Sequence, residues 1–240
     1  MSEPRIEVHD DPAALATAVA GELLSRLADA QAAGGIPQVA LTGGTIAEDI
    51  HREIARLSPG AEVDWSRVVV WWGDERFVAS DSGDRNSAQA GAAFLDAVGV
   101  DPANVHAMPS TDDVADVDAG ATAYAATLRE HGSGEFDVVM LGIGPDGHIA
   151  SLFPGFPQLD DEGIAVGVTG SPKPPPERIS LTFSSLNRAR SVWFLVSGDG
   201  KAAAVSAALG GADLHEIPAA GVTGREETIW FLDRAAASHL

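Results

Sequence analysis

The chain has 240 residues, 45% of them apolar, with a mean hydropathy of +0.05, which suits a soluble globular protein. Its 35 carboxylates against 15 basic residues give a net charge of −20, which disfavours nucleic acid and anionic membranes as partners because both would be repelled. The chain has no cysteine, which excludes disulfides, thiol nucleophiles and thiolate metal sites.

Helices and strands alternate along the first half of the chain. A helix is predicted after Asp10-Asp11-Pro12, because apolar residues recur on one face at Leu15, Val19, Leu23, Leu24 and Leu27. In chain order there follow a buried strand at 36–44 that ends in a glycine turn, a helix from about 45 to 57, a buried strand at 67–75, a polar loop at 73–87 and an alanine-rich helix at 86–98.

The second half continues the same alternation. It contains a helix at 115–130, a strand at 136–144, strands at 163–169 and 178–186 around a proline-rich bend at 171–177, a strand at 191–200, a helix at 201–209, a strand at 226–232 and a short terminal helix. No apolar run approaches the roughly 20 residues that span a bilayer. The N-terminal segment has no uninterrupted apolar core, so we expect no signal peptide and a cytoplasmic location.

Strands that alternate with helices form parallel βαβ units. The predicted fold class is therefore α/β, a three-layer α/β/α sandwich with a mostly parallel, modified Rossmann-like sheet. No repeat or long linker divides the chain, so residues 1–240 are expected to form one domain. In such sheets ligands bind at the carboxyl ends of the strands. Polar loops follow predicted strands at 42–45, 73–76, 142–148 and 197–201, and we expect them to meet there.

The loop 142–148 reads GIGPDGH and matches the G-x-G-x-x-G pattern of dinucleotide-binding turns. The match is weak, because Pro154 would cut short the following helix and Asp146 would bring negative charge close to a diphosphate. His148 beside Asp146 fits a general base better, since neutral histidine accepts a proton near pH 7 and a carboxylate can orient its ring. The residues alone leave open a tight strand exit in which His148 only caps a turn.

Two other loops have features of an anion site. In Thr42-Gly43-Gly44-Thr45, backbone N–H groups, two hydroxyls and a helix N-terminus could face a phosphate, although a glycine pair in a turn is common. Lys201 is one of only two lysines beside thirteen arginines. It begins a helix, where a cation opposes the helix dipole unless an anion lies nearby.

Arg178 could join Lys201 on that anion, or could be a surface arginine beside a sheet. We expect the second lysine, Lys173, simply to be exposed.

The loop after the strand 67–75 contains Asp74 and Arg76, which could position hydroxyls and a carbonyl or form an internal salt bridge. Asn86 could contribute there or act only as a helix N-cap. The chain has neither G-x-S-x-G nor H-E-x-x-H, and its seven histidines are dispersed, so we expect no serine triad, no metal site and no cofactor. Together the loops favour a small phosphorylated, hydroxyl-rich substrate.

Several segments resemble the 6-phosphogluconolactonase family, which belongs to a wider group of sugar-phosphate isomerases and deaminases. They occur in the family's order and cover nearly the whole chain: LTGGT, WWGDERFV, DRNS, LGIGPDGHIASLFPG, SPKPPPERISLTFSSLNRAR, SGDGKAAAV and IPAAGV with IWFLDRAAA. The most specific are GPDGHIASLFPG and SGDGKA.

The resemblance implies metal-independent hydrolysis of 6-phospho-D-glucono-1,5-lactone, the second step of the oxidative pentose phosphate pathway. Separately from the resemblance, we expect a monomer or a homodimer. His148 would be the general base with Asp146 in the same loop, and Asp74 and Arg76 would line the sugar side. The phosphate would be held by Thr42, Gly43, Gly44, Thr45, Arg178 and Lys201.

The first loop departs from the family pattern, because Ile46-Ala47 replace the usual hydroxyl residue and proline. We expect this difference to alter how the loop binds the phosphate. Two alternatives are a glucosamine-6-phosphate deaminase and a non-catalytic sugar-phosphate sensor. The deaminases typically have a glutamate soon after the D-G-H element, which the segment 149–154 lacks. A sensor usually carries an appended DNA-binding or effector module. The chain has no basic helix-turn-helix segment that would form such a module.

Overall fold

A six-stranded parallel sheet forms the centre of the molecule in the computed structural model, which describes residues 3–240. Its strand order is β1-β9-β8-β5-β2-β3, and every pairing between neighbours is parallel. The strands are β1 (Arg5–His9), β2 (Gln38–Leu41), β3 (Val69–Trp72), β5 (Val138–Leu141), β8 (Ser191–Val196) and β9 (Glu227–Asp233). The strands β2, β5 and β8 are buried along their whole length, as expected for parallel strands covered on both faces.

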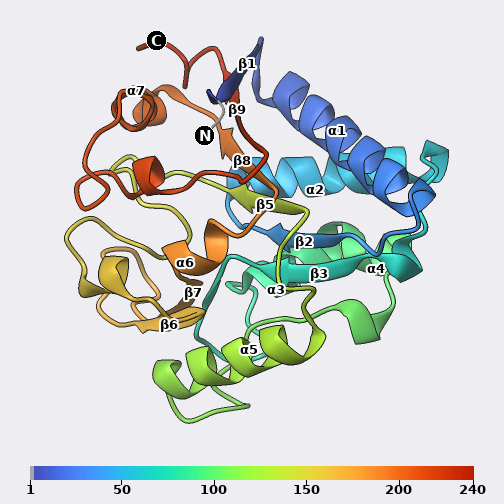
Figure 1. The fold of residues 1–240 in the computed structure, drawn as a ribbon, viewed down its shortest axis with the longest axis horizontal. Coiled ribbons are helices and arrows are strands. Elements are labelled where there is room, and N and C mark those ends of the chain that lie inside the picture. The colour runs from blue at the N-terminus through green and yellow to red at the C-terminus, as the bar shows by residue number, and fades with distance from the viewer. Residues whose placement is uncertain (1–2) are drawn as a thin grey trace.

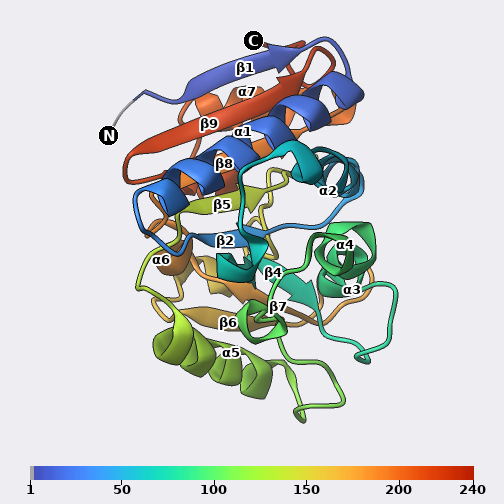
Figure 2. The ribbon, with the colours of Figure 1, turned by 90° about the vertical axis from the view of Figure 1, so that its right-hand side faces the viewer.

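Helices cover one face of this sheet, where α1 (Pro12–Ala32) and α2 (Thr45–Leu57) pack side by side (Figure 2). The predicted helix 86–98 lies on the same side as three consecutive segments, α3 (Asn86–Ala90), a π-helical turn (Gly91–Leu95) and α4 (Asp96–Val98). Apolar residues of these helices and of the sheet form one continuous core with Phe94, Trp72 and Trp193.

The other face is covered by α5 (Val117–His131), α6 (Phe183–Leu186), α7 (Ala202–Leu209) and a small antiparallel sheet (Figure 1). That sheet has the order β4-β7-β6, with β4 (Asp74–Arg76), β7 (Arg178–Leu181) and β6 (Ala165–Val168). A second core forms here around Trp71, Phe194 and Trp230. The three layers and the mostly parallel sheet confirm the predicted fold class.

Some element boundaries differ from the prediction. The segment 67–75 is not one strand, because Gly73 accepts a hydrogen bond from Leu181 N (2.8 Å) while donating to Leu41 O (2.9 Å). The chain thereby passes from the main sheet to the small one. The prediction of strand along the whole of 178–186 is wrong, because Thr182 caps α6 by accepting from Ser185 N.

At the two ends of the chain the structure also departs from the prediction. The prediction of a short terminal helix is wrong, because residues 234–239 form turns. The Asp233 carboxylate that ends β9 accepts from Ala236 N (2.7 Å) as well as from Ser197 Oγ (2.6 Å), which ties the following chain back to the strand ends. The edge strand β1 was not predicted, since its apolar residues Ile6 and Val8 are largely exposed and give no buried run.

Candidate active site

The loops that follow β2, β3, β5 and β8 meet at a cavity of about 240 Å³. The predicted site residues line it except Thr45 and Asp146, and those that do are Thr42, Gly43, Gly44, Asp74, Arg76, His148, Arg178 and Lys201. Asp146 contacts the His148 ring without lining the cavity, and Thr45 is an exposed residue at the start of α2. The structure therefore brings together side chains that are up to 159 positions apart (42 to 201) at the carboxyl edge of the sheet.

His148 and Asp146 form a hydrogen-bonded pair. His148 Nδ1 lies 2.5 Å from Asp146 Oδ1, and His148 N donates to the same oxygen (3.3 Å). Burial raises the pKa of Asp146, but the hydrogen bonds from His148 outweigh it and hold that pKa at about 2. Asp146 is thus ionised at neutral pH and favours the tautomer with the proton on Nδ1, which leaves Nε2 as the basic nitrogen.

Gly144 makes room for this pair. A Cβ at position 144 would lie 2.0 Å from His148 Nδ1 and 2.3 Å from Asp146 Oδ1. The His148 ring also contacts the Phe153 ring, with centroids 4.7 Å apart. The second glycine of the G-x-G-x-x-G pattern thus accommodates a histidine–carboxylate pair.

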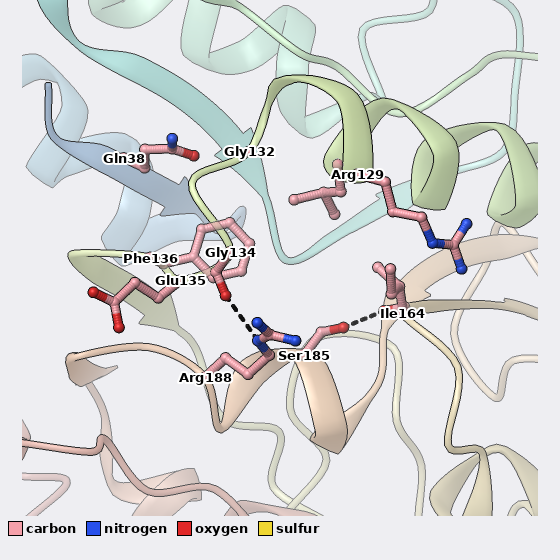
Figure 3. A pocket seen from close by; sticks show the side chains of 10 residues that line it. Gln38, Arg129, Gly132, Gly134, Glu135, Phe136, Ile164, Ser185 and Arg188 are labelled. Atoms are coloured by element: carbon pink, nitrogen blue, oxygen red, sulfur yellow. Dashed lines mark hydrogen bonds between the residues drawn. The ribbon is translucent and has the colours of Figure 1, made fainter.

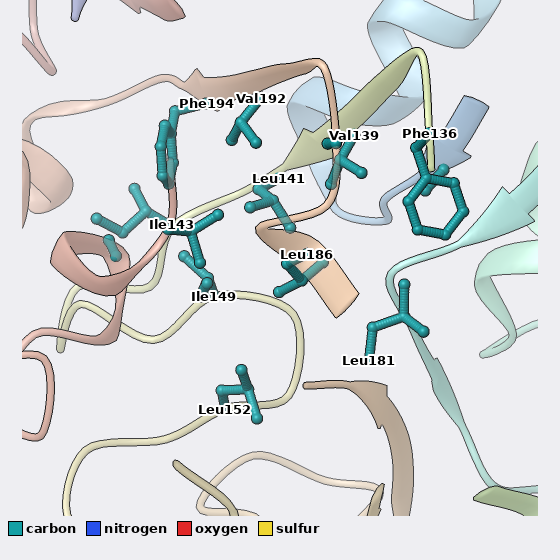
Figure 4. Packing of buried hydrophobic residues seen from close by; sticks show 14 of the residues in the cluster. Phe136, Val139, Leu141, Ile143, Ile149, Leu152, Leu181, Leu186, Val192 and Phe194 are labelled. Atoms are coloured by element: carbon teal, nitrogen blue, oxygen red, sulfur yellow. The ribbon is translucent and has the colours of Figure 1, made fainter. Parts of the chain in front are cut away.

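The loop that carries His148 is anchored in the core. Ile143, Ile149 and Leu152 point into the apolar cluster that contains Leu141 and Leu186 (Figure 4). Each of these three loop side chains is buried. His148 is therefore presented from a loop whose neighbouring side chains are packed, which fixes its position.

Asp74 connects this loop to the small sheet. Ser151 Oγ donates to Asp74 Oδ2 (2.7 Å), and Asn86 Nδ2 donates to Asp74 O (2.9 Å). Arg178 Nη1 lies 4.0 Å from Asp74 Oδ2. Asp74 is 6% exposed, so its carboxylate is held by defined partners at the cavity wall.

Asn86 also links Arg76 to the glycine loop. Arg76 Nη1 donates to Asn86 Oδ1, and a Cβ at Gly43 would lie 1.8 Å from that oxygen. Only glycine at position 43 allows this approach. The first residue of α3 therefore contributes a site side chain, and the helix start is capped instead by the buried Glu75, which accepts from Asn86 N (2.7 Å) and Ser87 N (2.9 Å).

Cationic groups converge on the rest of the cavity. Lys201 Nζ donates to Ile143 O (2.8 Å), and its half-buried position, with Lys173 nearby, lowers its pKa. Arg178 is 6% exposed, and burial lowers its pKa against the opposing effect of Asp74. In a chain with a net charge of −20, this local cluster suits an anionic ligand.

The glycine loop supplies the remaining wall. Gly44 has φ of 103° and precedes α2, and no side chain caps the N-terminus of that helix. The first N–H groups of the helix are therefore left for other acceptors. Buried Thr42 lines the cavity beside them.

A second cavity, of about 180 Å³, lies at the opposite edge of the sheet (Figure 3). Several of its polar side chains bond the backbone or a neighbouring side chain. Arg188 Nε donates to Gly134 O (2.7 Å), Ser185 Oγ donates to Ile164 O (2.7 Å), and Gln38 Oε1 accepts from Trp71 Nε1 (2.9 Å). It contains no predicted site residue.

Ser151 and Lys173 are polar residues at or against the site that the sequence analysis did not assign to it, and Asn86, whose role it left open, lines the cavity. Lys173 is exposed as expected but lines the cavity. Its signal was the rarity of lysine, which applied to Lys173 as well as to Lys201. Within residues 3–240, no cluster of three or more His, Asp or Glu side chains is placed to hold a metal ion. No helix in that range is long and apolar enough to cross a membrane.

The chain is similar to known proteins along nearly its whole length. The family model of glucosamine-6-phosphate isomerases/6-phosphogluconolactonases matches residues 10–230. A protein named 6-phosphogluconolactonase from Streptomyces coelicolor is 46% identical over 247 aligned positions, covering 99% of this chain and 95% of the relative.

Solved structures share the fold. The crystal structure of 6-phosphogluconolactonase from Thermotoga maritima has a TM-score of 0.86 at 24% identity and covers 96% of this chain and 99% of its own. A monomeric glucosamine-6-phosphate deaminase has a TM-score of 0.85 at 19% identity, covering 98% of this chain and 100% of its own. The fold is thus common to both activities, and the sequence match identifies the chain as a member of the glucosamine-6-phosphate isomerase/6-phosphogluconolactonase family.

Proposed function

We propose that the chain hydrolyses 6-phospho-D-glucono-1,5-lactone to 6-phospho-D-gluconate, the second step of the oxidative pentose phosphate pathway. The observation that carries the proposal is that His148, paired with Asp146, lines the same cavity as Lys201 and Arg178. A base and an anion site within one small cavity fit a substrate that has both a phosphate and an electrophilic carbonyl. The names of the relatives support this choice.

His148 acts as the general base. Its Nε2 takes a proton from a water molecule while the water oxygen bonds to C1 of the lactone, and Nδ1–H donates to the ionised Asp146. When the tetrahedral intermediate collapses, the bond from C1 to the ring oxygen breaks and His148 returns the proton to that oxygen. The new carboxylic acid then loses its proton to solvent. A lactone is an activated ester, so no covalent nucleophile is required.

Arg76 or backbone N–H groups of the loop 142–148 stabilise the negative charge that develops on the carbonyl oxygen. Asp74 is fixed by Ser151 and faces the cavity, where it orients the sugar hydroxyls. Thr42, Gly43, Gly44 and the start of α2, with Lys201 and Arg178, bind the phosphate. Thr45 contributes through the helix start, since its side chain does not line the cavity.

The proposal assigns no step to a metal ion. We expect the rate of lactone hydrolysis to remain unchanged after dialysis against EDTA and assay in metal-free buffer. A loss of activity that added Mg²⁺ or Zn²⁺ restores would contradict this part of the proposal.

The experiment that tests the activity is direct. The lactone is generated in situ with glucose-6-phosphate dehydrogenase, and its disappearance is followed with and without the protein after subtraction of spontaneous hydrolysis. Hydrolysis well above background supports the proposal. Release of ammonia from glucosamine 6-phosphate without lactone hydrolysis would favour the deaminase, and tight 6-phosphogluconate binding without turnover would favour a sensor.

A further inference from the structure

The chain has two lysines, Lys173 and Lys201, beside thirteen arginines, and both line the candidate active site. They come from different loops. Lys201 follows β8, whereas Lys173 lies in the proline-rich bend 171–177 that precedes β7. A role in surface solvation alone would not explain why the only two lysines of the chain line the same cavity of about 240 Å³.

The backbone of Lys173 is held in place although its side chain is exposed. Arg178 Nη2 donates to Lys173 O (3.1 Å) and Pro174 O (3.3 Å), and Arg178 Nε donates to Pro175 O (3.2 Å). Ser171 Oγ donates to Lys173 O (3.0 Å). These bonds fix the bend at the wall of the cavity and use much of the donor capacity of Arg178.

Neither ammonium group of this region has a carboxylate of residues 3–240 within 4.0 Å, and the charge of Asp146 acts on Lys201 only from farther away. Lys201 Nζ bonds a neutral carbonyl, and the Lys173 ammonium makes no hydrogen bond or ion pair with residues 3–240. After burial, the charge of Lys173 is the next cause that lowers the pKa of Lys201. Two ammonium groups that repel each other across a cavity are complementary to an anion placed between them.

We propose that Lys173 is a phosphate-binding residue and that Arg178 positions it by holding the bend 171–177. This inference rests on the proposed function only for the identity of the substrate. A phosphate monoester carries a charge of about −1.5 to −2 at neutral pH, which Lys173 and Lys201 together neutralise. Arg178 contributes a third positive charge through Nη1, which lies near Asp74, and its hydrogen bond to Lys173 O keeps Lys173 at the cavity wall.

The test compares Lys173→Met and Lys173→Arg with wild type. Arg225→Gln is the matched control, because it removes one positive charge from an exposed position just before β9, at the other edge of the sheet. Isothermal titration gives the Kd of 6-phosphogluconate and of inorganic phosphate, and thermal unfolding checks that each variant is folded. Hydrolysis of the phosphorylated lactone is measured beside that of unphosphorylated glucono-1,5-lactone.

We expect Lys173→Met to raise the Kd of 6-phosphogluconate about ten-fold, the lower end for a hydrogen bond to a charged group. Lys173→Arg should recover part of this loss, and Arg225→Gln should show none. The loss in lactone hydrolysis should fall on KM, so that the preference for the phosphorylated lactone drops by a similar factor. If Lys173 only supports the structure of the bend, Lys173→Met should instead lower hydrolysis of the phosphorylated and the unphosphorylated lactone by the same factor.

Three results would overturn the inference: an unchanged Kd in Lys173→Met, an equal loss in Arg225→Gln, or no binding of either phosphate compound by the wild-type chain. If wild type binds 6-phosphogluconate through Lys173 but hydrolyses no lactone, the proposed function fails and the role of Lys173 stands. If wild type hydrolyses the lactone and Lys173→Met binds 6-phosphogluconate as tightly as wild type does, the proposed function stands and the role of Lys173 fails.

Discussion

Two cavities lie at opposite edges of the same sheet, and they differ in what their polar groups do. At the amino ends of the strands, Arg188, Ser185 and Gln38 bond neighbouring groups of the protein and support the fold (Figure 3). At the carboxyl ends, Lys201 and Lys173 line one cavity and the charge of Lys173 lowers the pKa of Lys201, while His148 has a basic nitrogen beyond its bond to Asp146. A hollow alone therefore does not indicate a site, whereas converging groups with spare bonding capacity do.

The largest expected effect comes from His148→Ala. Removal of a general base typically lowers kcat by 10²- to 10⁴-fold, about 3–5 kcal/mol of barrier. Arg129→Gln, which changes an exposed side chain at the opposite cavity, should leave kcat unchanged. The kcat of both variants is measured by steady-state lactone hydrolysis. A wild-type kcat in folded His148→Ala would contradict the proposed difference between the two cavities.

Gly144→Ala should have the next largest effect. The new methyl group would collide with the His148 ring and the Asp146 carboxylate, and a shift of about 1 Å in a catalytic group can cost about 10²-fold in rate. Gly21→Ala is the matched control, since a Cβ there meets nothing within 4 Å in helix α1. It should raise the free energy of unfolding by roughly 0.5–1 kcal/mol. Equal kcat values for the two variants would show that the close approach at Gly144 has no catalytic role.

A smaller effect is expected from Asp146→Asn on stability. The pKa of Asp146 is about 2 in the folded chain against about 3.9 when unfolded. Its contribution is therefore complete above pH 4 and is lost as the pH falls from about 4 to 2. Because the side chain is 40% exposed, solvent screening reduces that contribution to about 1 kcal/mol.

Urea unfolding at pH 7 and at pH 3 measures this prediction. Wild type should lose more stability than Asp146→Asn between the two pH values. Asp29→Asn, on an exposed side chain of helix α1, controls for the loss of one negative charge. An identical pH dependence in wild type and Asp146→Asn would mean that the pair with His148 contributes nothing to stability.

Much of the fold and site could be predicted from the sequence, because each rests on local signals. Buried parallel strands appear as apolar runs, and the glycine and polar loops after them mark the carboxyl edge of the sheet. The small antiparallel sheet could not be predicted as a separate unit, since the break at Gly73 depends on hydrogen bonds to β2 and β7 that are distant in sequence.

The residues missed at the site depend on the same long-range geometry. Ser151 reaches Asp74 from 77 positions away, and Lys173 lines the cavity from a bend whose carbonyl groups accept hydrogen bonds from Arg178. Asn86 could have been a simple cap until the structure showed that Glu75 fulfils that role. Residue type indicated which groups are candidates for the site, but tertiary packing determined which of them meet.

Chemical rescue of His148→Ala by imidazole tests directly whether His148 is the general base. If His148 is the base, removal of its ring leaves a space beside Phe153 in which free imidazole can take the proton from water. Lactone hydrolysis by the variant should rise with imidazole concentration and saturate, while the same additions to Gly144→Ala should raise the rate by no more than the background reaction of the buffer. No rescue, together with normal 6-phosphogluconate binding by the variant, would contradict the assignment of His148 as the general base.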